Sequence, residues 1–268
     1  MNGCARERGR ADALRGCFVT GTDTDVGKTR VSAALLHWLA TQGWRGAGYK
    51  PVAAGMEWLD GTWINPDVRA LRHASGVPLT DAEVGPCQFA AACAPHIAAA
   101  LEGRRIARAA LLAGAHRLAA RADRLVIEGA GGFRVPLGED FDGGDLAADL
   151  GLPVVLVVGL RLGCLNHALL SAEAVAARGL RLAGWIGNTI DPAMPHAGDN
   201  LGFLFEAMER HGAPCLGVVP RLDSAAPADL LVWLDEPALR TVFEMAASPL
   251  PAMPETRVST PPEIYNQS

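Results

Sequence analysis

The chain has 268 residues, of which 50% are hydrophobic and 20% are charged, and its formal net charge is −5. This composition is that of a folded globular protein and excludes a chain that is disordered throughout. The acidic balance argues against nucleic acid as a partner, because proteins that bind a phosphate backbone usually carry a basic excess on one face.

The sequence predicts no membrane segment and no secretory signal. Its longest apolar run, residues 152–160, is far shorter than the roughly 20 residues that span a bilayer. The first fifteen residues mix Arg, Glu and Asp without a continuous apolar stretch. The six cysteines are scattered, which suits a reducing compartment. We therefore expect a cytoplasmic protein with no membrane partner.

Short apolar runs alternate along the chain with longer stretches of helical periodicity. The predicted strands are residues 17–20, 47–51, 125–128, 153–159, 182–188 and 215–220. The predicted helices include residues 29–41, 106–121, 166–178 and 201–211. Nearly continuous apolar character indicates strands that are covered on both faces, as in a parallel sheet. The alternation predicts a doubly wound, mostly parallel α/β fold of the P-loop type.

One domain, residues 16–247, accounts for these elements. We expect residues 1–15 to form an N-terminal extension, and residues 248–268, which are rich in Pro, Ser and Thr, to form a disordered tail. Arg117, Arg121 and Arg124 recur at helical spacing, which favours a solvated helix face over a functional patch.

A phosphate-binding loop is the strongest signal in the sequence. The first predicted strand runs into GTDTDVGKT, residues 21–29, and an amphipathic helix follows directly. In this context, backbone N–H groups at the helix start face the phosphates. We expect Lys28 to contact the β- and γ-phosphates and the Thr29 hydroxyl to bind Mg²⁺. The usual pattern has glycine at the position of Thr22, so the loop is a variant.

Two carboxylates and a second lysine follow apolar segments. Glu128 ends a predicted strand, and ligands bind at the carboxyl ends of strands in such sheets. Mg²⁺ binds one or two carboxylates together with phosphate oxygens, so Glu128 is a candidate ligand. Asp67 opens a predicted helix, where an acid serves equally well as a helix cap. Lys50 ends a strand and is placed to stabilise negative charge on a transferred phosphoryl group.

These residues belong to a series of ordered blocks: FVTGTDTDVGKT, AGYKPVAAG, NPD, APHI, VIEGAGG, PVVLVVGLRLGCLNHALL, AGWIGN and LGVVPRL. Over about residues 18–222 the series resembles the dethiobiotin synthetase family, P-loop enzymes of biotin biosynthesis. The resemblance implies the reaction of that family. CO₂ is joined to 7,8-diaminononanoate, ATP phosphorylates the carbamate to a carbamic-phosphoric mixed anhydride, and the ureido ring closes with release of ADP and phosphate.

The resemblance also implies roles for individual residues. Thr29, Asp67 and Glu128 match the metal ligands of the family, and Lys50, Lys28 and Thr24 match its catalytic centre. The implied nucleotide contacts are Asp25, Val26, Gly27, Lys28, Thr29, Arg30, Glu128, Gly129, Ala130, Gly131, Asn188, Thr189, Pro220, Arg221 and Leu222. The Asn188 amide offers a donor and an acceptor to an adenine edge. The implied substrate contacts are Ala54, Cys164, Leu165 and Asn166.

The segment that holds Cys164 to Asn166 meets the substrate across a two-fold axis in the family, so a homodimer with the substrate site at the subunit interface is implied. Three positions depart from the family pattern. Ala54 stands where a hydroxyl residue is usual, Arg161 replaces a common lysine, and Thr189 replaces a frequent acid. Since none of these is a metal or phosphate ligand, we expect them to affect substrate geometry more than catalysis.

Two other classes of P-loop protein are alternatives. Amide-forming ligases such as the cobyrinate diamide synthases share the fold but usually append a glutamine-hydrolysing domain, for which this chain has no room. Partitioning and cell-division-site ATPases carry a signature lysine where this chain has Asp23. They also need a basic surface or an amphipathic tail to bind DNA or membrane, and the sequence predicts neither.

Overall fold

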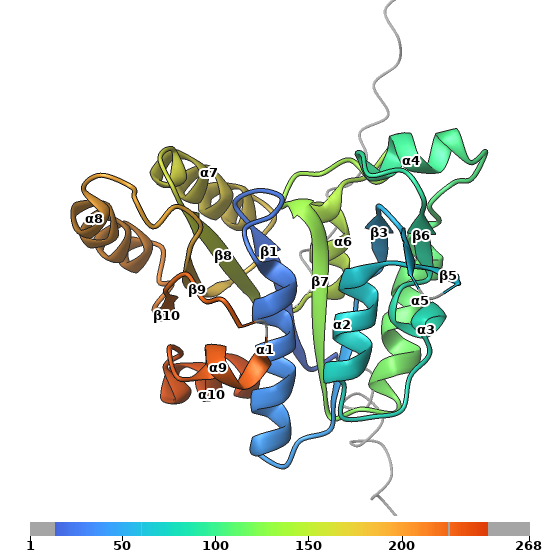
Figure 1. The fold of residues 1–268 in the computed structure, drawn as a ribbon, viewed down its shortest axis with the longest axis horizontal. Helices are drawn as coiled ribbons and strands as arrows, with labels where there is room; N and C mark the ends of the chain where they lie inside the picture. Colours follow the sequence, from blue (N-terminus) through green and yellow to red (C-terminus); the bar gives the residue numbers. More distant parts are fainter. Residues whose placement is uncertain (1–13, 60, 225, 246–268) are drawn as a thin grey trace, which may run out of the picture.

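The computed structural model describes residues 14–59, 61–224 and 226–245. Within these ranges, a six-stranded parallel sheet has the order β10-β9-β8-β1-β7-β2 (Figure 1). Its strands are β1 (Gly16–Gly21), β2 (Gly46–Tyr49), β7 (Arg124–Gly132), β8 (Val154–Leu160), β9 (Leu182–Thr189) and β10 (Cys215–Val219). Beside it lie a parallel pair, β3 (Val52–Ala54) with β6 (Cys87–Phe89), and an antiparallel hairpin, β4 (Glu57–Leu59) with β5 (Thr62–Ile64).

Helices cover both faces of the main sheet, which confirms the doubly wound α/β prediction (Figure 1). One hydrophobic cluster packs under α1 (Lys28–Thr41), α2 (Pro66–Ala74), α3 (Asp81–Val84), α9 (Pro227–Leu231) and α10 (Glu236–Glu244). The other packs under α4 (Pro95–Leu101), α5 (Arg108–Ala119), α6 (Gly143–Leu150), α7 (Cys164–Ala177) and α8 (Ala197–Arg210).

Alternating side chains of each central strand enter the two clusters in turn. In β1, Phe18 belongs to the cluster under α4–α8, whereas Cys17 and Val19 belong to the cluster under α1. Successive side chains of a strand point to opposite faces, so a strand covered on both sides must be apolar at nearly every position. This is why the central strands read as unbroken apolar runs in the sequence.

Some boundaries differ from the prediction. β7 continues through Gly132, so Glu128 lies within the strand and not at its end, because the glycines after it keep pairing with β1 across a register shift. The interpretation of three arginines on one helix face is wrong: α5 ends at Ala119, before Arg121, and Arg124 begins β7. Arg121 pairs with Glu83, and the Arg124 guanidinium lies 4.4 Å from the centre of the Trp44 ring.

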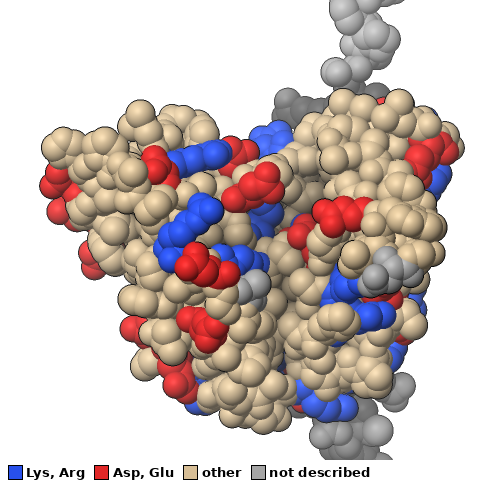
Figure 2. All heavy atoms as spheres, viewed as in Figure 1, with Lys and Arg blue, Asp and Glu red and all other residues tan. Residues whose placement is uncertain are grey.

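The predicted tail, residues 248–268, lies outside the described residues, as do residues 1–13 of the predicted extension. Leu14 precedes β1 and is buried in the core. No helix in the described ranges has both the length and the apolar character needed to cross a membrane. Figure 2 shows acidic and basic side chains interspersed over one face of the molecule.

Candidate active site

The loop between β1 and α1 is anchored to the sheet by its own side chains. Val26 is 1% exposed and packs so closely on Gly21 and Gly159 that a Cβ at either glycine would lie 2.7 or 2.6 Å from a Val26 methyl group. Thr22, the residue at the position where the pattern expects glycine, accepts a hydrogen bond of 3.1 Å from the Gly159 N–H. The variant position therefore fastens the loop to β8 through its hydroxyl.

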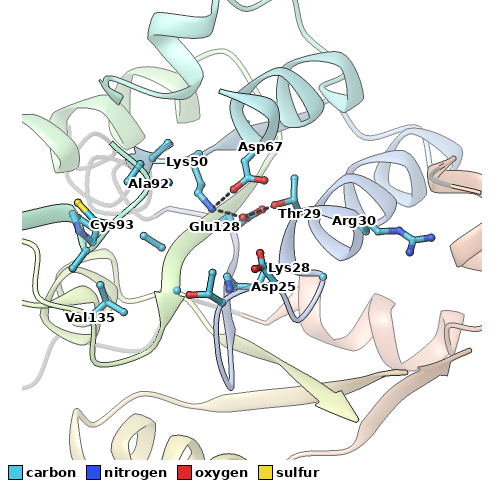
Figure 3. Close-up of a pocket in the computed structure, with 18 residues that line it drawn as sticks. Asp25, Lys28, Thr29, Arg30, Lys50, Asp67, Ala92, Cys93, Glu128 and Val135 are labelled. Carbon is cyan, nitrogen blue, oxygen red and sulfur yellow. Dashed lines mark hydrogen bonds and ion pairs between the residues drawn. The ribbon is translucent and has the colours of Figure 1, made fainter. Parts of the chain in front are cut away.

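A cavity of about 850 Å³ opens beside this loop (Figure 3). It lies at the carboxyl end of the sheet, where ligands bind in open α/β folds. Its lining includes most of the site residues expected from the sequence: Thr24, Asp25, Gly27, Lys28, Thr29, Arg30, Lys50, Ala54, Asp67, Glu128, Ala130 and Gly131.

An ion-pair cluster stands at the centre of the cavity wall (Figure 3). Lys50 follows β2 directly, and its Nζ lies 2.5 Å from Oε1 of Glu128 and 3.0 Å from Oδ2 of Asp67. The Thr29 hydroxyl donates a hydrogen bond of 2.9 Å to the same Glu128 oxygen. Glu128 is fully buried and Lys50 is 4% exposed, so neither charge has water to compensate it. The cluster joins the phosphate loop, β7, α2 and the end of β2.

The carboxylates keep Lys50 charged. Burial lowers the pKa of the Lys50 ammonium, but the attraction of Glu128 and Asp67 and their hydrogen bonds outweigh it, so the pKa is raised. Burial raises the pKa of Asp67, but the contact with Lys50 outweighs it and lowers the pKa.

Lys28 has a different environment, because burial and repulsion by Lys50 lower its pKa to about 8. Its Nζ donates a hydrogen bond of 2.7 Å to the Asp23 carbonyl, within the phosphate loop. The chain contains only these two lysines, Lys28 and Lys50, and both line the cavity. Both lysine ammonium groups therefore lie where an anionic ligand would sit, beside the carboxylates of Asp25, Asp67 and Glu128.

The donor atoms beside Lys50 suit Mg²⁺. The second carboxylate oxygen of Glu128, Oε2, is buried and accepts no hydrogen bond from the described residues. The side chain of Asp67 is 42% exposed, which leaves room for a further ligand on that carboxylate. A hydroxyl and two carboxylates are hard oxygen donors of the kind that Mg²⁺ combines with phosphate oxygens and water. The residues present thus fit the expected metal.

A second group of expected nucleotide contacts lies outside the cavity lining. The Asn188 side chain, from β9, reaches the phosphate loop and donates a hydrogen bond of 2.9 Å to the Val26 carbonyl. Arg221, on the segment after β10, donates one of 3.0 Å to the Ile190 carbonyl at the end of β9. Arg30 lines the cavity, but its guanidinium points away from it and binds the Ser224 carbonyl at 2.5 Å (Figure 3). The remaining members of this group are Val26, which is buried in the core, Gly129, Thr189, Pro220 and Leu222.

Of the expected substrate contacts, too, only some line the cavity. Ala54 lines the cavity, whereas Cys164, Leu165 and Asn166 form the first turn of α7 and do not. Cys164 is 2% exposed and packs in the core, whereas Asn166 is exposed. The structure does not bring this turn to the cavity of its own chain.

Six lining residues were not assigned from the sequence: Ala53, Ala92, Cys93, Ala94, Pro95 and Val135. They come from β3, from the segment between β6 and α4, and from the loop after β7. Their side chains are small or apolar and carry no charge, and in Figure 3 Cys93 and Val135 lie apart from the ion-pair cluster. Ala94 and Pro95 belong to the APHI block that was part of the family resemblance. Small uncharged residues do not by themselves indicate a binding site.

A parallel sheet with a phosphate loop after β1 and a buried lysine beside two carboxylates defines a nucleotide-binding enzyme of the P-loop class. A family model described as an AAA domain matches residues 15–229. The ATP-dependent dethiobiotin synthetase BioD of Aromatoleum aromaticum is 52% identical over 224 residues, covering 83% of this chain and 98% of that protein. The protein of the same name from Janthinobacterium sp. (strain Marseille) is 49% identical over 223 residues, covering 82% and 93%. The chain belongs to the dethiobiotin synthetase family.

Among solved structures, the signal recognition particle receptor FtsY from Elizabethkingia anophelis in complex with GDP matches with a TM-score of 0.44 and 16% identity. The match covers 87% of this chain and 64% of that chain, so this chain spans less than two thirds of the length of that structure.

Proposed function

We propose that this protein is an ATP-dependent dethiobiotin synthetase that carboxylates 7,8-diaminononanoate with CO₂ and closes the ureido ring. The single observation that carries the proposal is the meeting of Lys50 with Lys28, Thr29 and Glu128 around one cavity. A phosphate loop alone is shared by many NTPases. A second buried lysine facing the same space suits a reaction in which a carboxylate becomes phosphorylated, because negative charge must be stabilised on both partners.

The reaction follows in three balanced steps. An amine of the substrate adds to CO₂ and loses a proton, which gives a carbamate. A carbamate oxygen attacks the γ-phosphorus of ATP, the bond to ADP breaks, and the product is a carbamic-phosphoric mixed anhydride. The second amine attacks the carbonyl carbon and loses a proton, phosphate leaves with the electrons of the C–O bond, and the ureido ring is closed. Phosphorylation is needed because the negative charge of a carbamate repels the incoming amine.

We assign the polar residues of the cavity to the phosphate side of this reaction. The loop from Thr24 to Arg30 holds the triphosphate, with Lys28 on its β- and γ-phosphates and Thr24 near the transferred group. Lys50 stabilises the carbamate and the transferring phosphoryl group. Thr29, Asp67 and Glu128 would hold Mg²⁺, which when bound neutralises charge on the phosphates.

The uncharged part of the lining is assigned to the substrate. Diaminononanoate carries a long aliphatic chain, and the small residues Ala54, Ala92 and Pro95 offer it an apolar surface in the same cavity as the cations. The turn at Cys164, Leu165 and Asn166 would serve the cavity of a partner subunit in a homodimer. Asn188, Thr189 and the segment Pro220 to Leu222 would surround the base. We further propose that the enzyme acts in the cytoplasm.

The test is a coupled assay with purified protein. Diaminononanoate, bicarbonate and MgATP together should release ADP and phosphate and yield dethiobiotin, and omission of any one should stop the release. ATP hydrolysis without diaminononanoate, accelerated by DNA or lipid, would instead indicate a partitioning-type ATPase and would refute the proposal.

A further inference from the structure

Asn188 makes a contact with the phosphate loop that recognition of a base does not require. Its Nδ2 donates a hydrogen bond of 2.9 Å to the carbonyl oxygen of Val26, 162 residues away in the sequence. Asn188 is 6% exposed and lies near the carboxyl end of β9, between Gly159 of β8 and Val219 of β10. The hydrogen bond therefore ties the loop to the interior of the sheet.

The Gly27 backbone packs directly against the same Asn188 amide. Its φ is +88°, in the left-handed region, and a Cβ at this position would lie 2.3 Å from Nδ2 of Asn188. Gly27 is also the N-cap of α1, the helix whose first N–H groups are expected to face the phosphates. The Asn188 amide thus contacts both residues that precede the helix start.

The geometry of the peptide between Val26 and Gly27 gives this contact a consequence. In a trans peptide, the C=O and N–H groups point in opposite directions. With the Val26 carbonyl held by Asn188, the N–H of Gly27 is turned away from Asn188, and Gly27 lines the cavity. The Val26 side chain is locked between Gly21 and Gly159, so the peptide is held from two sides.

We infer that Asn188 is a positioning residue for the phosphate loop: its amide fixes the Val26–Gly27 peptide in the orientation that presents the Gly27 N–H to a phosphate. The inference rests on the proposed nucleotide-binding function and adds to the role of Asn188 beside the base. One N–H and the oxygen of the amide remain available after the bond to Val26 is made. One side chain then serves the base and the phosphates together.

Inorganic tripolyphosphate with Mg²⁺ separates the two roles, because it has the phosphates of ATP and no base. Its affinity, and that of MgATP, are measured by calorimetry for the full chain and for Asn188→Ala. Asn200→Ala is the matched control, since Asn200 Nδ2 donates a hydrogen bond of 2.8 Å to the His196 carbonyl on α8, outside the cavity lining. Thermal unfolding checks that each variant is folded.

We expect Asn188→Ala to weaken tripolyphosphate about three- to tenfold, the effect of one neutral hydrogen bond, and to weaken ATP at least as much. Asn200→Ala should change neither. If Asn188→Ala does not fold, Asn188→Leu replaces it, because leucine fills more of the buried volume. The same loss of tripolyphosphate affinity is expected of it. An unchanged affinity for tripolyphosphate in the folded variant overturns the inference, whatever happens to ATP. A wild-type protein that binds neither ligand overturns the proposed function as well.

Discussion

Lys50 and Glu128 form a buried ion pair in the cavity wall, with 2.5 Å between Nζ and Oε1, although they lie 78 positions apart in the chain. Oε1 also accepts the Thr29 hydrogen bond, which leaves Oε2 without a partner among the described residues. The two oxygens of one carboxylate are thus divided between Lys50 and the expected metal.

Lys50→Ala should abolish turnover and leave MgATP affinity within a few fold of wild type, because Lys28 and the loop amides are untouched. It should also destabilise the fold by about 3–5 kcal/mol, since it leaves the Glu128 carboxylate buried without its cation. Product formation, calorimetry and denaturant unfolding measure the three effects. Arg45→Ala is the control for stability, because the Arg45–Asp123 pair is exposed and its loss should hardly shift the unfolding midpoint.

Glu128→Gln should raise the Mg²⁺ concentration needed for half-maximal activity by about tenfold or more, because an amide is a poorer ligand than a carboxylate. The variant preserves side-chain volume, and Asp67 still pairs with Lys50, so the fold should persist. A Mg²⁺ titration of activity at saturating ATP measures the effect, with Glu83→Gln, whose partner Arg121 lies on the surface, as the control. An unchanged titration would remove Glu128 from the metal site.

Asn65→Ala should loosen the metal site through α2. The Asn65 side chain caps this helix by accepting from the Val68 N–H at 3.1 Å, and it donates to the Gly55 carbonyl at 2.8 Å. Loss of a cap costs about 0.5–2 kcal/mol and should displace Asp67 in the first turn. Asp235→Ala removes the equivalent cap of α10, where the distance is 2.8 Å. Asn65→Ala should lose more stability, because Asn65 is buried and also binds Gly55, and only Asn65→Ala should raise the Mg²⁺ requirement.

Gly27→Ala should abolish binding of MgATP, because the new methyl group has no space beside Asn188 and the backbone there is left-handed. Gly43→Ala provides the comparison: its φ is +77°, yet nothing lies within 4 Å of the added Cβ. Backbone strain alone costs of order 1–3 kcal/mol. Both substitutions should therefore lower the free energy of unfolding, whereas only Gly27→Ala should lower the MgATP affinity measured by calorimetry. Equal nucleotide affinity in the two variants would contradict the crowding at Gly27.

The six strands of the main sheet were predicted from the sequence because burial on both faces leaves a continuous apolar signal. The short strands carry no such apolar signal. β3 to β6 have three residues each, and the exposed side chains of β4 show no inward-facing position that a pattern could reveal. Helix α4 was missed for a similar reason, since its run of Ala carries little periodicity. Helix α6 was missed because it is only eight residues long and opens with two glycines, which favour a turn.

The candidate site was predicted to different extents. The phosphate loop follows from local sequence, because strand, loop and helix are contiguous. Asp67 entered only through the family resemblance, since an acid at a helix start is ordinary capping chemistry. Its contact with Lys50, and the contact of Lys50 with Glu128, depend on how β2, α2 and β7 pack together. Such long-range distances leave no trace in one sequence.

The confinement of both lysines to the cavity has a consequence for labelling. Arginine keeps its charge at any physiological pH and does not react as an amine, so the positive side chains outside the cavity neither titrate nor accept acyl groups. Apart from the chain's own α-amino group, an amine-directed reagent has only Lys28 and Lys50 to attack. Lys50 is kept charged by its ion pairs, so Lys28, whose pKa is lowered to about 8, is the more reactive of the two. The extent of Lys28 acylation therefore reports whether a ligand covers the phosphate loop.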